Sequence, residues 1–200
     1  MKFVYPEGAT PLDGDELNAL LPKHITLQSE LNEWEQLNIL EAEKWGFGRR
    51  HTDILSMAFI QRLHRKMFNE TWKWAGQFRT TLKNIGIMPY EIPQELAKLC
   101  ADVQMQMDYG VMLFDEVAAR LHHRLVWTHP FPNGNGRHAR IYTDILLVNH
   151  HLPKFTWGQD NLTASTQTRK TYIQALREAD RHNFIPLFDF VRQIKIGYTL

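Results

Sequence analysis

Apolar residues recur at every third or fourth position along most of the chain, which is the spacing of one face of an α-helix. The clearest stripe consists of Ile92, Leu96, Leu99, Cys100, Val103 and Met107. Pro93 suits the first turn of this helix, and Tyr109-Gly110 marks its end. The pattern predicts a mainly α-helical domain, with helices at about residues 26–50, 53–68, 93–109, 117–125, 135–148, 164–181 and 185–194.

One stretch, from Gln77 to Glu91, has a different pattern. Residues typical of strands alternate and are followed by turn residues: Phe78, Thr80 and Leu82, then Asn84 and Gly86. We expect a small β-hairpin here, and an irregular connection is the alternative.

The N-terminal residues are rich in helix breakers, namely Pro6, Gly8, Pro11, Gly14 and Pro22. Residues 1–24 are therefore expected to form an extended arm that lies over the domain. The domain itself is expected to cover residues 25–200 and to include the first long helix, at about residues 26–50.

Composition narrows the class of protein. A chain of 200 residues with 44% hydrophobic residues is long enough for one domain with a real core. Lys and Arg number 23 against 22 Asp and Glu, so no basic excess favours a general nucleic-acid binder. No stretch approaches 18 uninterrupted apolar residues, and no basic start precedes an apolar run. We therefore expect no membrane span and a cytoplasmic location.

The strongest chemical signal runs from His129 to Arg140 and reads His-Pro-Phe-Pro-Asn-Gly-Asn-Gly-Arg-His-Ala-Arg. Gly134 and Gly136 allow a ligand to approach the main chain, so backbone N–H groups there can hold a phosphate. Arg137 and Arg140 share one face of the following helix and can add charge-assisted contacts. His129 is a candidate general base, and Phe131 is expected to point inward and anchor the loop. Taken alone, a Gly-Asn-Gly segment is usually an ordinary helix–helix turn.

This stretch resembles the signature of the Fic family, His-x-Phe-x-(Asp/Glu)-Gly-Asn-Gly-Arg-x-x-Arg. Residues from about Ile25 onward are similar to the small bacterial Fic proteins called mobile mystery protein B. The resemblance implies a Fic fold, a helical bundle whose hairpin is called the flap, and transfer of AMP from ATP to a hydroxyl of a target protein. It also implies that His129 deprotonates the target hydroxyl and that Arg140 grips the γ-phosphate. The other phosphate-binding residues that it implies are Gly134, Asn135, Gly136 and Arg137.

Asn133 departs from the family pattern, which usually has Asp or Glu at this position. The family's carboxylate binds the Mg²⁺ that bridges the phosphates, and an amide oxygen is a weaker ligand for this hard cation. Asn133 is therefore expected to be a weak Mg²⁺ ligand.

The resemblance also assigns a role to the first long helix. Some Fic proteins carry an inhibitory helix with the pattern (Ser/Thr)-x-x-x-Glu-(Gly/Asn), whose Glu pairs with the second Arg of the signature. Thr26 and Glu30 fit this pattern, although Leu31 replaces the Gly or Asn. We therefore expect Glu30 to pair with Arg140 and to inhibit the protein in cis. The alternative is a helix cap with a solvated first-turn acid.

Further roles rest on the resemblance alone. The flap is expected to dock an unknown target protein through Lys83, Asn84, Ile85 and Gly86. Tyr172 and Asp180 occupy places that lie near adenosine in the family. Two alternatives for the function stay open: a phosphotransferase that uses the γ-phosphate, and a nucleotide-binding or toxin-like module. A homo-oligomer also stays open. A metal hydrolase built on His122, His123 and His138 is disfavoured, because the central loop offers glycine and arginine rather than converging ligands.

Overall fold

A computed structural model describes residues 10–159, 162 and 166–192 of the chain. Over these residues the fold is mainly α-helical, and two 3₁₀ turns, Pro89–Glu91 and Trp157–Gln159, connect some of the helices. The α-helices are α1 (Gly14–Asn18), α2 (Gln28–Phe47), α3 (Met57–Phe68), α4 (Ile92–Tyr109), α5 (Phe114–Thr128), α6 (Asn135–Asn149), α7 (Gln167–Asp180) and α8 (Ile185–Val191).

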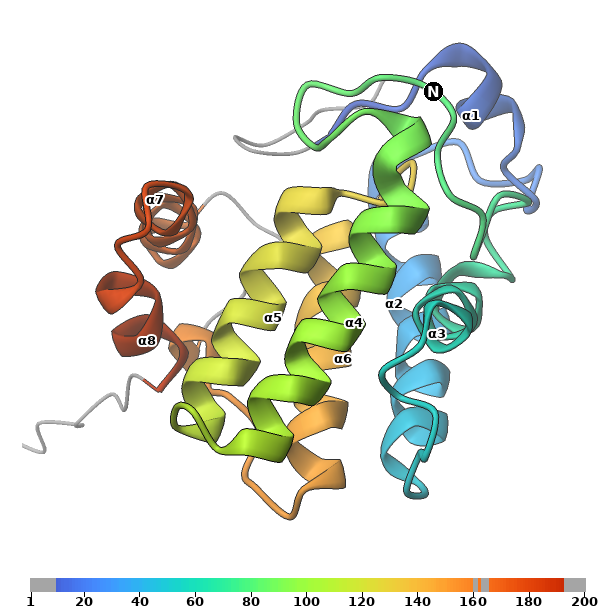
Figure 1. Cartoon of the computed structure of the whole chain (residues 1–200). Helices are drawn as coiled ribbons and strands as arrows, with labels where there is room; N and C mark the ends of the chain where they lie inside the picture. Colours follow the sequence, from blue (N-terminus) through green and yellow to red (C-terminus); the bar gives the residue numbers. More distant parts are fainter. Residues whose placement is uncertain (1–9, 160–161, 163–165, 193–200) are drawn as a thin grey trace, which may run out of the picture.

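Helices α4, α5 and α6 lie side by side in the middle of the molecule, with α2 and α3 on one side and α7 and α8 on the other (Figure 1). One apolar cluster fills the space between α2, α3, α4, α5 and α6, and a second lies between α5, α6, α7 and α8. Helix α6 contributes to both clusters and is buried over most of its length. No helix in the described part of the chain is long and apolar enough to cross a membrane.

The turn between α5 and α6, residues 129–134, carries the sequence motif and is called the site turn below. Its two ends have positive φ angles, 51° at His129 and 77° at Gly134. Phe131 is fully buried, and its ring stacks on His64 with 3.7 Å between the ring centroids. The Asn135 side chain accepts a hydrogen bond from the Phe131 N–H and donates one to its carbonyl. The turn is therefore held rigidly from its inner side.

The predicted mainly helical class is confirmed, although several helices begin or end at other residues than the hydrophobic pattern suggests. Helix α2 begins at Gln28 and ends at Phe47, and α3 begins at Met57 because the Ser56 side chain caps its first turn by accepting from the Phe59 N–H. Residues 1–9 of the predicted arm, residues 164–165 of one predicted helix and residues 193–194 of the last one lie outside the described residues.

The predicted β-hairpin is not confirmed, because no strand is formed among the described residues and residues 77–88 form an irregular loop. We call this segment the flap loop. The buried guanidinium of Arg79 donates hydrogen bonds to the carbonyls of Thr81, Ile87 and His129. Two of these carbonyls belong to the loop itself, so a side chain organises the backbone where a hairpin would use a strand-to-strand ladder.

Burial strongly lowers the pKa values of four of the buried histidine rings. Burial lowers the pKa of His122 to about 3 and the pKa values of His129 and His138 to about 4, and it holds the pKa of His64 well below the ordinary value of 6.5. Burial shifts the pKa of Asp144 in the opposite direction and raises it to about 6.

We therefore expect the free energy of unfolding to decrease as pH falls from 6.5 towards 4. In this window the unfolded chain protonates the four imidazoles while the folded protein keeps them neutral, and the single proton that Asp144 takes up in the folded state offsets only one of them. Urea unfolding at a series of pH values measures the effect. A free energy of unfolding that is constant or rises on acidification would contradict it.

Two glycines of the motif are expected to differ in their tolerance of a side chain. A Cβ at Gly134 would lie 2.5 Å from the buried Phe68 ring and would require φ of 77°. Gly136 lies inside α6, and a Cβ there meets only an Arg140 nitrogen, at 3.7 Å. Gly134→Ala should destabilise the protein by about 2 kcal/mol or more, whereas Gly136→Ala should be neutral or stabilising by up to about 1 kcal/mol. Thermal unfolding of the pair tests this, and equal melting temperatures would count against it.

Candidate functional site

A cavity of about 880 Å³ opens at the N-terminal end of α6. This volume is in the range of pockets that bind small ligands. Segments far apart in the sequence form its walls, including residue 10, helix α2, the flap loop, the site turn and helix α7. The motif residues among its lining are His129, Asn133, Gly134, Asn135, Gly136, Arg137 and Arg140.

His129 lies at one rim of this cavity and is 5% exposed. Its Nδ1 faces the Val126 carbonyl oxygen at 3.4 Å, and its Nε2 lies 2.7 Å from the Thr10 hydroxyl oxygen. A carbonyl can only accept, so this bonding pattern assigns the proton to Nδ1 and leaves a lone pair on Nε2. Burial, together with the nearby charges of Arg79 and Lys83, lowers the pKa of His129 to about 4. The imidazole is therefore a neutral base at neutral pH.

Arg137 and Arg140 bring two positive charges to the same cavity. Arg137 Nη1 donates to the Glu35 carboxylate at 2.6 Å, and its guanidinium lies over the Phe68 ring. Arg140 lies over the ring of Tyr172, and in the described part of the chain it has no carboxylate in ion-pair contact. Burial lowers the pKa of Arg140, which remains a cation at neutral pH. This end of the cavity is suited to an anion.

The predicted Glu30–Arg140 ion pair is not formed. Glu30 is exposed in the first turn of α2, and its carboxylate accepts hydrogen bonds from the N–H groups of Thr26 and Leu27, both at 3.0 Å. These bonds hold the pKa of Glu30 below its ordinary value. Glu30 therefore acts as a helix cap, and Thr26 contributes its backbone N–H to that cap.

Glu35 is the carboxylate of α2 that reaches the cavity. It is 6% exposed, accepts from Trp72 Nε1 at 2.6 Å and pairs with Arg137, which is the first and not the second arginine of the motif. Its position was detectable in the sequence, because Glu35 lies four residues from Leu31 and from Ile39 and therefore falls on the buried face of the helix.

Tyr172 and Asp180 both line the cavity from α7. The Tyr172 hydroxyl lies 2.8 Å from His122 Nε2, and Asp180 Oδ1 lies 2.9 Å from His123 Nε2. Two of the three histidines that suggested a metal hydrolase, His122 and His123, are thus bonded to other side chains. His138 is bonded to the Ile60 carbonyl instead.

Asn133 lines the cavity, but the described residues contain no group of three His, Cys, Asp or Glu side chains that could hold a metal ion. Its Oδ1 accepts from the Gly134 N–H at 2.6 Å and lies 3.4 Å from Arg137 Nη2. Mg²⁺ often keeps water and phosphate oxygens as most of its ligands. A Mg²⁺ at this place would therefore take most of its ligands from a polyphosphate and water, with Asn133 as the expected weak protein ligand.

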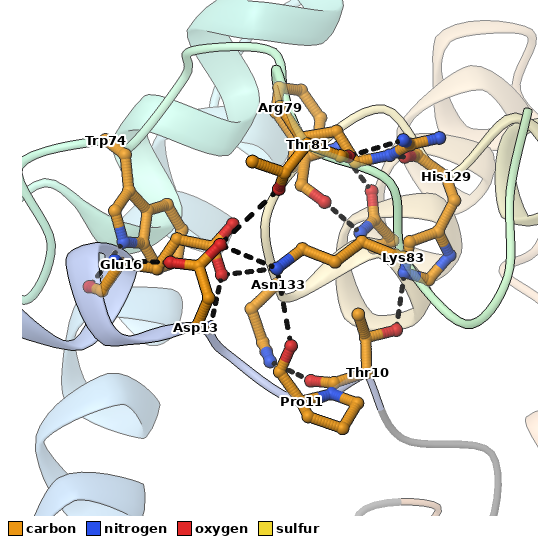
Figure 2. A network of polar contacts seen from close by, with 12 residues as sticks. Thr10, Pro11, Asp13, Glu16, Trp74, Arg79, Thr81, Lys83, His129 and Asn133 are labelled. Atoms are coloured by element: carbon orange, nitrogen blue, oxygen red, sulfur yellow. Dashed lines mark hydrogen bonds and ion pairs between the residues drawn. The ribbon is translucent and has the colours of Figure 1, made fainter. Parts of the chain in front are cut away.

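The flap loop borders the cavity through Ile85, Gly86 and Ile87. Gly86 has φ of 98°, and a Cβ there would lie 2.6 Å from the Cβ of His129. Asn84 and Lys83 belong to the same loop, and the Lys83 ammonium is bound by residues 11–16. Arg79, which the sequence analysis did not identify, joins this loop to the His129 carbonyl (Figure 2).

Comparisons with known proteins identify relatives of this chain. Protein adenylyltransferase fic-1 of Caenorhabditis briggsae is 29% identical over 147 residues, which are 72% of this chain and 27% of the relative. The Uridine 5'-monophosphate transferase of Xanthomonas campestris pv. campestris (strain 8004) is 55% identical over 38 residues, 19% of this chain and 7% of the relative. This chain thus spans about a quarter of the length of the first curated relatives that it matches.

The fold is also similar to that of solved structures. The N-terminal Fic domain of a VirB-translocated Bep effector protein from Bartonella quintana, crystallised with bound ADP, superposes with a TM-score of 0.69 at 19% identity. The superposition covers 90% of this chain and 94% of that chain. Residues 54–147, which contain the whole site turn, match the model described as the Fic/DOC family. Residues 54–147 of the chain are therefore identified as a Fic/DOC family segment.

Proposed function

We propose that this protein is a protein adenylyltransferase that transfers AMP from ATP to a hydroxyl side chain of a target protein. The observation that carries the proposal is the shared cavity, which is lined by a neutral imidazole, two arginines and a glycine-rich turn. The adenylyltransferase names of the relatives and the ADP bound in a structural neighbour support the same activity.

In this reaction the target hydroxyl attacks the α-phosphorus of ATP. Its proton passes to the lone pair on Nε2 of His129, the bond between the α-phosphorus and the bridging oxygen breaks, and pyrophosphate leaves. Arg137, Arg140 and the backbone N–H groups of residues 134–136 would stabilise the charge on the phosphates. Mg²⁺ that arrives with ATP would neutralise part of that charge, with Asn133 as its protein ligand.

Helix α2 would inhibit this reaction in cis, through Glu35 and not through the predicted Glu30. The Glu35 carboxylate occupies Nη1 of Arg137, and a guanidinium that binds a carboxylate has fewer donors left for a phosphate. The second hydrogen bond to Glu35, from Trp72, holds the carboxylate in this place.

The proposed activity is tested with purified protein, cell lysate, Mg²⁺ and ATP labelled at the α-phosphate. We expect labelled proteins with wild type and a loss of about a hundredfold or more with His129→Ala, since the base is then missing. Parallel reactions with α-labelled UTP test the choice of nucleotide, which the name of one relative leaves open.

Other outcomes would favour the alternatives. Label retained from the γ-phosphate and not from the α-phosphate would identify a phosphotransferase. ATP binding without any transfer, even after Glu35 is replaced, would indicate a nucleotide-binding module.

The inhibitory role of Glu35 is tested by Glu35→Gln, which removes the charge and keeps an acceptor for Trp72. Freeing one charge-assisted contact of Arg137 should raise transfer by about tenfold or more. Glu30→Gln is the matched control on the same helix and should leave transfer near the wild-type level. Equal transfer by wild type and Glu35→Gln at saturating ATP, or activation by Glu30→Gln alone, would reject the assignment.

A further inference from the structure

The segment before α1 enters the cavity at the position where a target hydroxyl would be deprotonated. Thr10 is 5% exposed, and its hydroxyl oxygen lies 2.7 Å from Nε2 of His129. The Asn133 side chain donates to the Thr10 carbonyl oxygen at 3.0 Å (Figure 2). Both the side chain and the main chain of Thr10 are therefore bound by the site turn.

Several contacts beyond Thr10 hold residues 11–21, so the position of Thr10 does not depend on one hydrogen bond. The Lys83 ammonium of the flap loop donates to the Pro11 carbonyl at 3.4 Å and forms ion pairs with Asp13 and Glu16 (Figure 2). Trp74 Nε1 donates to the Glu16 carbonyl at 3.1 Å. Further along, backbone hydrogen bonds join residues 19–21 to residues 71–73.

The hydrogen bonding and the position of the Thr10 hydroxyl suit a group that attacks a phosphate. Since Nδ1 of His129 carries the ring proton, the Thr10 hydroxyl is the donor of the hydrogen bond to Nε2. The Thr10 hydroxyl oxygen accepts no hydrogen bond from the described residues. The oxygen thus keeps its lone pairs. Thr10 also lines the same cavity as Gly134, Arg137 and Arg140, where the phosphates of a nucleotide would bind.

We propose that Thr10 is an acceptor of AMP in cis, modified by its own chain. This proposal rests on the proposed adenylyltransferase activity. The Thr10 hydroxyl oxygen would form a bond with the α-phosphorus of ATP, its proton would move to Nε2 of His129, and the bond from the α-phosphorus to pyrophosphate would break. The products are a threonyl-AMP ester at Thr10, pyrophosphate and a proton that His129 later releases.

The test uses the full chain, incubated with Mg²⁺ and α-labelled ATP both as wild type and as Glu35→Gln. Intact-mass measurement should show the gain of one AMP, and fragmentation should assign it to Thr10. Thr10→Ser should retain the label, and Thr10→Val should lose it. Thr81→Val is the matched control, because Thr81 belongs to the same polar network but its hydroxyl faces Asp13 and not His129.

Mixing separates modification in cis from modification between chains. A His129→Ala chain of distinguishable mass, mixed with the active protein, should stay unlabelled at Thr10, and the labelled fraction of the active chain should not depend on protein concentration. Label at Thr10 of the inactive chain would overturn the assignment in cis.

The same reactions with added cell lysate distinguish failure of this proposal from failure of the proposed function. Labelled lysate proteins with an unlabelled Thr10 would reject Thr10 as an acceptor and leave the adenylyltransferase intact. Absence of transfer to any protein, with Glu35→Gln as well as wild type, would reject both.

Discussion

The constraint on which the site depends is the burial of helix α6. Its residues are buried along nearly the whole length, and the half-buried ones are Gly136, Arg137, Arg140 and Val148. The first three lie within its first two turns, next to the cavity. Since most of the rest of the helix is packed between two apolar clusters, the cavity meets α6 at this end. This end is also where the unpaired backbone N–H groups of a helix are found.

Such burial requires that the polar groups on α6 have partners, and each partner fixes a neighbouring segment. His138 bonds to the Ile60 carbonyl of α3, and Tyr142 donates to the Ile54 carbonyl. Asp144 accepts from the Phe155 N–H and from Trp157 Nε1. Unpaired buried groups would be costly, so these contacts also set the orientation of α6 and hence the direction of its two arginines.

The sequence was informative where one local pattern decides the structure. Periodicity identified the long helices, and the glycines and prolines around His129 identified the turn. The prediction of a hairpin was wrong because alternation of side chains does not show how a backbone is held. The Arg79 side chain binds two carbonyls of the flap loop and the His129 carbonyl, which is fifty residues away in sequence. The expectation for Glu30 rests on a motif pattern alone. Helical geometry favours Glu35, since a first-turn acid is well placed to bond to the backbone N–H groups of its own helix end.

The two segments that precede α3 contact different halves of the proposed reaction centre. Glu35 of α2 contacts Arg137, on the side proposed to bind phosphate, and Thr10 contacts His129, on the side proposed for the attacking hydroxyl. Glu35 adds a negative charge where a phosphate would have to bind, so its contact with Arg137 opposes binding of the nucleotide. Thr10 adds a neutral hydroxyl to a neutral imidazole, so its contact resembles the arrangement that the reaction itself requires. This difference in charge is the reason to regard the first contact as inhibitory and the second as that of a substrate.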